Sequence, residues 1–185
     1  MKGQKSLPFL MIPALLAAGY LWVSASAKAA DKAAASPEVT QLLSSTEKEA
    51  LELRDDAMKM QSFTRSQLGR ESHAQQITLI KEHVNKAGEL LAQMHANREA
   101  AAPWQQQAID EITPLLRQLA DNTTAAIEHL NSNPTRLSQP GYKEYLAANS
   151  AAAERLATLV GDYVEYGQAH EKLDLLSEKL DTTQN

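Results

Sequence analysis

Tyrosine and histidine are the side chains of this sequence whose types and spacing could support chemistry. Four of the five tyrosines lie between Gly141 and His170, and the chain contains five histidines and no cysteine. A tyrosine cluster could transfer protons or line a cofactor pocket, and histidine can bind haem or a divalent metal. The absence of cysteine excludes disulfides, thiolate metal sites and cysteine nucleophiles. The helices that carry these residues decide whether they could share a site.

None of the histidines has the spacing of a metal site on a single helix. Di-metal helical bundles use Glu-x-x-His, and helix-borne zinc sites use His-x-x-x-His or HExxH, and the sequence has none of these patterns. Motifs for a serine nucleophile, a phosphate-binding loop or a dinucleotide are absent as well. The sequence therefore predicts no catalytic residues and no metal ligands, and an enzyme is not expected.

Apolar residues recur every three or four positions beyond Ser36, which is the pattern of amphipathic helices. Ser36 and Pro37 form a typical helix start, a capping hydroxyl followed by proline at the first helical position. Gly69 is expected to end the first helix in a left-handed conformation, and Ser72 with Gln75 is expected to cap the second. Helices are predicted at about residues 37–68, 72–100, 103–131 and 140–181.

Each predicted helix has one apolar stripe that should face a shared core. Short connections make successive helices antiparallel, so the predicted fold is all-α, an antiparallel up-down-up-down four-helix bundle with long helices. On the first three helices the stripes comprise Val39, Leu43, Thr46, Ala50, Leu53, Ala57, Met60, Ile77, Ile80, Val84, Ala87, Leu91, Met94, Ile109, Ile112, Leu116, Leu119, Thr123, Ala126 and Leu130.

The fourth predicted helix follows alternating steps of three and four residues, the spacing of a coiled-coil seam. All four tyrosines fall on this seam, so core packing explains them without a catalytic role. Asn149 is expected to be a polar core residue that fixes the register of the helices, or else to face the rim of the bundle. The seam consists of Tyr142, Tyr145, Asn149, Ala152, Leu156, Leu159, Tyr163, Tyr166, His170, Leu173, Ser177 and Leu180.

In an antiparallel bundle, residues on successive helices that are equally far from the connecting turn lie at the same level along the axis. Comparison of these levels leaves two histidine pairs, at opposite ends of the predicted bundle. His95 and His170 fall near one end, and His73 and His129 fall near the other. Either pair could bind haem or metal or act as a pH-sensitive element, or each histidine could simply be partly buried with an ordinary hydrogen bond. Met60 is roughly 30 Å from His170 along the bundle axis, which excludes a Met–His haem site. No cofactor is predicted, and His95 and His170 are the candidates for the alternative.

Residues 1–27 have the features of a cleaved secretory signal peptide. Lys2 and Lys5 precede an apolar stretch, and Ala25-Ser26-Ala27 matches the small-residue pattern of a cleavage site, so the mature chain is expected to begin at Lys28. Residues 28–36 are predicted to be a flexible lead-in and residues 37–181 the bundle. The alternative is an uncleaved anchor, because the apolar stretch is nearly long enough to span a membrane. Either reading exports the folded part, so a periplasmic or secreted location is expected.

The net charge of the chain limits the class of partner that it could bind. Without Lys2 and Lys5 the chain has 16 basic and 23 acidic side chains, a net charge near −7, which disfavours binding to nucleic acid. The expected function is that of an exported, non-enzymatic bundle of the cell envelope, an adaptor or chaperone-like protein that binds another envelope protein or itself. The alternative is a periplasmic haem- or metal-binding bundle that uses His95 and His170. Membrane contact is expected only if the leader is uncleaved.

Overall fold

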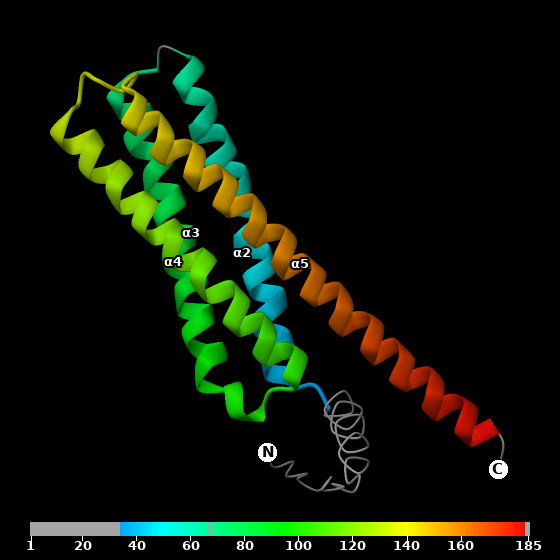
Figure 1. The fold of residues 1–185 in the computed structure, drawn as a ribbon. Coiled ribbons are helices and arrows are strands. Elements are labelled where there is room, and N and C mark those ends of the chain that lie inside the picture. Colours follow the sequence, from blue (N-terminus) through cyan, green and yellow to red (C-terminus); the bar gives the residue numbers. More distant parts are fainter. Residues whose placement is uncertain (1–33, 67, 184–185) are drawn as a thin grey trace, which may run out of the picture.

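The computed structural model describes residues 34–66 and 68–183, which form an all-α bundle of four long helices. The helices are α2 (Pro37–Ser62), α3 (Arg70–Ala96), α4 (Pro103–Ser132) and α5 (Pro140–Thr183). Two short 3-10 turns, η1 (Phe63–Arg65) and η2 (Arg98–Ala100), follow α2 and α3. Successive helices run in opposite directions side by side (Figure 1). The predicted antiparallel four-helix bundle is confirmed.

The helices are arranged as a ring in which each packs against two others. The adjacent pairs are α2–α3, α3–α4, α4–α5 and α2–α5, so α3 and α5 lie diagonally opposite each other. Every residue of the stripes predicted on the first three helices is buried between them. Each buried leucine, isoleucine or valine contributes about 1.5–3 kcal/mol through removal of its side chain from water. The helical period therefore identified the core of these three helices correctly.

The connection between α2 and α3 differs from the prediction. The first α-helix ends at Ser62 instead of residue 68, and Gly69 has a φ of −77°, so it is not a left-handed cap. It is the residue before α3, whose first turn already closes with a hydrogen bond from the His73 amide to the Gly69 carbonyl at 3.4 Å. The second helix therefore begins at Arg70, two residues before the predicted cap at Ser72.

Gln105 joins the start of α2 to the start of α4. Its side-chain oxygen accepts from the backbone N–H of Ser36 at 2.8 Å and of Ala102 at 2.9 Å. Its amide donates to the Ser36 carbonyl at 2.9 Å and to the Thr40 hydroxyl at 3.0 Å. The Ser36 hydroxyl in turn accepts from the Val39 amide at 3.4 Å, as predicted for the helix cap. These bonds fix the end of the bundle from which the last part of α5 projects (Figure 1).

The predicted signal peptide, residues 1–27, and residues 28–33 of the predicted lead-in lie outside the described residues. Among the helices of the described part, none combines the length and the apolar character that a membrane span requires. The anchor alternative concerns the leader, which this finding does not cover.

Candidate functional site

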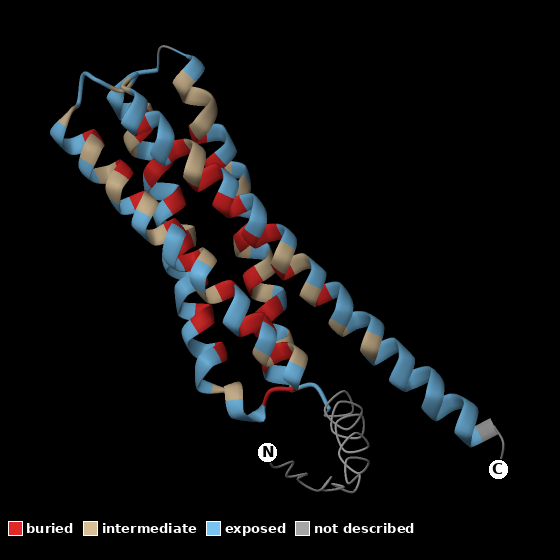
Figure 2. Cartoon of the chain, in the orientation of Figure 1, coloured by how far each residue is buried: buried red, intermediate tan, exposed pale blue. Residues whose placement is uncertain are grey.

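Helix α5 is much longer than its neighbours, and only its first part belongs to the core. It has 44 residues, whereas α2, α3 and α4 have 26, 27 and 30. Its buried side chains end at Val164, and from Glu171 to Thr182 every side chain is exposed. Figures 1 and 2 show this last part extending past the end of the bundle. We call residues 168–182 the projecting segment, which is about 22 Å long at 1.5 Å per residue.

The seam predicted along α5 is wrong beyond the first part of the helix. The buried face of α5 follows the period of a straight α-helix. The predicted seam follows a seven-residue repeat, which falls behind such a helix by about 20° in every heptad. From Tyr145 to Leu180, about five heptads, the two patterns diverge by about 100°. The seam therefore joins two apolar stripes that lie on different faces. The buried residues of α5 are Tyr142, Leu146, Asn149, Ser150, Ala152, Ala153, Leu156, Ala157, Val160 and Val164.

The four tyrosines consequently have different environments. Tyr142 is fully buried, as predicted, whereas Tyr145 and Tyr166 are 37% and 39% exposed, so core packing does not explain these two. Tyr163 is half-buried, and burial, together with a hydrogen bond to Glu111 and the charge of that carboxylate, raises its pKa to about 12. Asn149 is buried and donates to the Thr123 hydroxyl at 3.0 Å, which confirms the polar core position.

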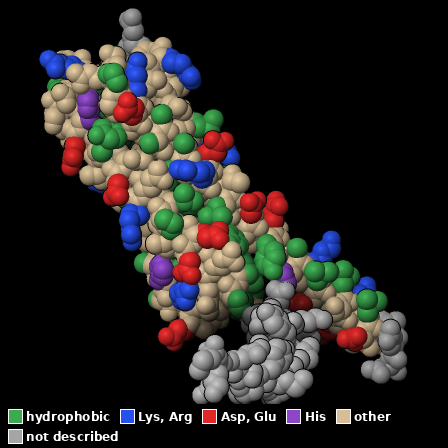
Figure 3. Space-filling view, in the orientation of Figure 1, with side chains coloured by type: hydrophobic (Ala, Val, Ile, Leu, Met, Phe, Trp, Pro, Cys, Tyr) green, Lys and Arg blue, Asp and Glu red, His purple; other side chains and the backbone are tan. Residues whose placement is uncertain are grey.

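The projecting segment carries an exposed apolar stripe. Leu173, Leu176 and Leu180 follow one another at steps of three and four residues and are 61%, 48% and 64% exposed. Leu175 is 61% exposed as well, but it lies about 100° around the helix from Leu176 and is not part of this stripe. Tyr166, at the same spacing, continues the stripe back to the bundle, where its ring meets Trp104 edge-on at 5.4 Å. Figure 3 shows hydrophobic side chains along this part of α5. Contiguous exposed apolar surface of this kind is typical of a binding surface.

Charged residues are sorted around the projecting segment. At about 100° per residue, Lys172 and Lys179 border the leucine stripe on one side, and His170 and Ser177 border it on the other. The acidic side chains lie on the opposite face of the helix. They are Glu171, Asp174, Glu178 and Asp181. The apolar stripe therefore has a basic edge and no acidic one.

A groove of about 750 Å³ opens where α5 leaves the bundle, between the projecting segment and the starts of α2 and α4. Its lining includes Pro37, Trp104, Gly167 and His170. A Cβ atom at Gly167 would lie only 2.9 Å from the Trp104 ring. Glycine at this position therefore allows the tryptophan to pack directly against the backbone of α5 at its exit.

The histidines of the first predicted pair are not brought together. His95 lies on α3, is exposed, and has its Nε2 atom 3.1 Å from the Thr113 hydroxyl. His170 lies on α5, which is diagonal to α3, and its ring contacts Tyr166 at 4.5 Å. In the described part of the chain no hydrogen bond, ion pair or ring contact joins the two. Their positions give the haem- or metal-binding alternative no support.

The second predicted pair does meet, on opposite sides of Tyr142. The hydroxyl of Tyr142 is hydrogen-bonded to Nδ1 of His73 at 3.0 Å, and the ring of His129 stacks on the tyrosine at 5.0 Å. Phe63 covers His73 edge-on at 5.3 Å. Burial lowers the pKa of His73 and raises that of Tyr142 to about 12, so both groups are neutral near pH 7. This is a packed aromatic cluster that closes one end of the core.

Sequence reasoning missed a group of charged residues on α2 and α3. Nδ1 of His83 lies 3.0 Å from a Glu49 oxygen and 3.7 Å from a Glu52 oxygen, and its Nε2 lies 3.5 Å from Asp56. The Glu-x-x-His pattern places glutamate and histidine on the same helix, whereas this group spans two helices. Level matching would have found it, because Glu49 and His83 are equally far from Ser66 in the turn between the helices.

Comparison with protein-family models, with curated proteins and with solved structures finds no match for this chain. Functional inference rests on the geometry of the chain itself.

Proposed function

We propose that this protein is an exported, non-enzymatic helical bundle of the cell envelope that binds another protein through the projecting segment of α5, as an adaptor or chaperone-like protein. One observation carries the proposal: Leu173, Leu176 and Leu180 are exposed on a helix that has left its own bundle. Short helices in water are marginal unless an apolar face is packed against another element. A partner that covers this stripe would therefore stabilise the segment. Export is proposed from the leader pattern in residues 1–27.

The partner proposed is an amphipathic helix of a different protein, with acidic residues on the borders of its own apolar stripe. Such a helix would place carboxylates beside Lys172 and Lys179, and charges that flank a helical seam select the partner and its orientation. A second copy of this chain fits less well. An antiparallel copy that sets Leu173 against Leu176 brings the two lysines of the opposed segments together, while the acidic residues point away.

A membrane surface is a weaker match. Within residues 168–182 there are two lysines and four acidic residues, so the segment is net negative. Helices that lie on anionic membranes are typically rich in lysine and arginine on their polar face. The polar face here carries the acids, which anionic lipid would repel.

The proposal is tested with a synthetic helix of about three heptads that has leucine at the seam and glutamate on both borders. A matched peptide carries lysine on the borders, and fluorescence anisotropy measures binding of each to the full mature chain. We expect the glutamate peptide to bind more tightly. Replacement of Leu173 and Leu176 by Asp should weaken its binding at least tenfold, because two leucines that the bound peptide would cover are lost. The control replaces Leu51 and Leu79, which are 38% and 40% exposed on the bundle surface, by Asp and should leave binding unchanged.

Three outcomes would contradict this partner. Equal or tighter binding of the lysine peptide would remove the charge argument. A concentration-dependent dimer in sedimentation that is abolished by Leu173→Asp would identify a second copy as the occupant. Binding to vesicles of phosphatidylglycerol and phosphatidylethanolamine that depends on the same leucines would identify a membrane surface.

A further inference from the structure

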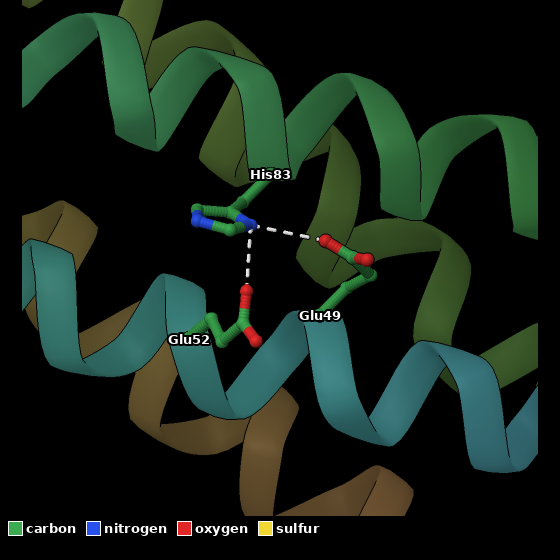
Figure 4. A group of neighbouring side chains, drawn as sticks. All are labelled: Glu49, Glu52 and His83. Carbon is green, nitrogen blue, oxygen red and sulfur yellow. Dashed lines mark hydrogen bonds and ion pairs between the residues drawn. The ribbon is translucent and has the colours of Figure 1, made fainter.

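Four ionisable side chains on α2 and α3 converge far from the projecting segment. Glu49, Glu52 and Asp56 lie on one face of α2 and all approach His83 of α3, and Figure 4 shows the two glutamates and the histidine pointing toward one another across the helix pair. One oxygen from each glutamate and one histidine nitrogen lie within 4.8 Å of one another. Three of the side chains are mostly buried: His83 is 18% exposed, Glu49 19% and Asp56 20%.

The spacing of these atoms matches the coordination shell of a small transition-metal ion. Zinc binds imidazole nitrogen and carboxylate oxygen at about 2.0–2.2 Å, so ligand atoms of a tetrahedral site lie about 3.4 Å apart. The two distances from Nδ1 of His83, 3.0 Å to Glu49 and 3.7 Å to Glu52, bracket that value. All three ligand atoms lie within 4.8 Å of one another, so side-chain movements alone could close them around an ion.

A second set of contacts orients the histidine. With Nδ1 facing the glutamates, Nε2 faces a carboxylate oxygen of Asp56 at 3.5 Å. The other oxygen of Asp56 accepts from Gln76 at 2.8 Å, and Gln76 is only 3% exposed. A metal-bound histidine commonly donates its other N–H to a carboxylate that is itself held by a hydrogen bond. Here Asp56 lies opposite Nε2 at the distance of an ion pair, and the buried Gln76 holds that carboxylate.

Charge favours a cation between these residues. Three carboxylates face one imidazole, so the group stays net negative even when His83 is protonated. In the described part of the chain, the arginine ion pairs join Arg54 to Asp55 and Arg98 to Asp110, and none reaches Glu49, Glu52 or Asp56. The side chain of Glu52 is 50% exposed, which leaves a path for an ion and a place for a water ligand.

We propose that Glu49, Glu52 and Nδ1 of His83 form a binding site for a divalent first-row transition ion such as Zn²⁺, with Asp56 as the residue that positions His83. A mixed set of imidazole and carboxylate ligands suits zinc and its neighbours better than Ca²⁺ or Mg²⁺, which prefer oxygen ligands alone. The site departs from the sequence-based expectation of no metal. It does not depend on the proposed function of α5, because all of its residues lie on α2 and α3.

The test is Zn²⁺ titration of the full mature chain, freed of metal by chelation, with calorimetry and thermal melts as two readouts. We expect one ion per chain and a melting temperature that rises with Zn²⁺. His83→Asn should weaken binding at least about 100-fold and remove the thermal shift, since a ligand is lost. Asp56→Asn should weaken binding about 10–100-fold. The control His95→Asn changes an exposed histidine on the same helix and should leave binding unchanged.

A histidine that only forms ion pairs would give a different result. Absence of saturable binding up to about 0.1 mM Zn²⁺, or equal binding in the wild type and His83→Asn, would overturn the site. If His83→Asn fails to fold by circular dichroism, Glu52→Gln decides, because that half-exposed side chain makes one contact at 3.7 Å and its loss should not affect folding. Unchanged affinity in Glu52→Gln would then overturn the proposed ligand set.

Discussion

The two parts of α5 are one continuous helix with opposite surroundings. Between Tyr142 and Val164 its apolar face is buried against α2 and α4, whereas in residues 168–182 Leu173, Leu176 and Leu180 are exposed and lie on a different face. Both parts have apolar residues at helical spacing, so the spacing alone predicts a helix equally well in each. What separates them is direction: the first stripe faces the bundle core, and the second lies on a different face of the helix, beyond the end of that core. The first part therefore holds the bundle together, and the second leaves uncovered the apolar surface that is proposed to bind a partner.

The largest expected effect contrasts leucines from the two parts. Leu156 is fully buried, so Leu156→Ala should lower the free energy of unfolding by about 2–5 kcal/mol through lost burial and a residual cavity. Leu173 is 61% exposed, and Leu173→Ala should change the free energy of unfolding by less than about 0.5 kcal/mol. Urea unfolding followed by circular dichroism measures both. Similar losses for the two variants would mean that the parts of α5 are not distinct.

The buried residues of a helix could be predicted from the sequence where the helix is packed along most of its length. On α2, α3 and α4 the apolar stripe runs along most of each helix, so the stripe and the core coincide. On α5 the sequence contains two stripes, and the regular spacing through Tyr145, Tyr166 and Leu173 hid the change of face between them. The point at which α5 no longer packs against α2 and α4 is set by the lengths of those helices, so it cannot be read from the sequence of α5 alone.

The prediction of which histidines meet was limited by a different factor, the direction of each side chain. Level matching placed His73 and His129 at one end correctly, but it does not say which way a side chain points. It therefore could not distinguish this pair, which meets at Tyr142, from His95 and His170, which do not meet. The interaction of His83 with Glu49 was within reach of the same reasoning, because a charged stripe on one helix needs only a histidine at the matching level on the next.

The aromatic cluster in the bundle should make stability depend on pH. Burial lowers the pKa of His73 below its ordinary value of 6.5 in the folded state. As pH falls through about 6.5, the unfolded chain therefore binds a proton that the folded chain does not, and the free energy of unfolding decreases until the folded pKa is reached. The measurement is urea unfolding at pH 7.5 and pH 5.0 for the wild type and for His73→Gln.

The His73→Gln variant separates the contribution of His73 from that of other groups that titrate in the same pH range. We expect a smaller loss on acidification in His73→Gln than in the wild type, alongside a destabilisation of about 1–3 kcal/mol at pH 7.5, because Tyr142 loses its buried partner. The same loss on acidification in both proteins would show that His73 is not the group that titrates.

Two glycines test the boundary between the parts of α5. Alanine is favoured over glycine in a helix by about 0.5–1 kcal/mol. Gly161 lies within the bundle, and a Cβ there would make an ordinary contact of 3.6 Å with Glu47, so Gly161→Ala should be stabilising by that amount. Gly167 lies at the exit, where a Cβ would be 2.9 Å from the Trp104 ring, so Gly167→Ala should gain less or become destabilising. Thermal melts of both variants make the comparison, and an equal gain in each would mean that Trp104 does not pack closely against α5.

The smallest effect on folding is expected from removal of the part of the projecting segment that follows His170. A chain that ends at His170 keeps the contact of Tyr166 with Trp104 and that of His170 with Tyr166, and the described side chains that it loses, residues 171–182, are all exposed. Its free energy of unfolding should therefore stay within about 0.5 kcal/mol of the full chain, since exposed residues bury no apolar surface. Binding of the glutamate-bordered peptide should nevertheless be lost, because Leu173, Leu176 and Leu180 are gone. A large loss of stability on truncation would show that the segment belongs to the fold, and unchanged peptide binding would move the binding surface to the bundle.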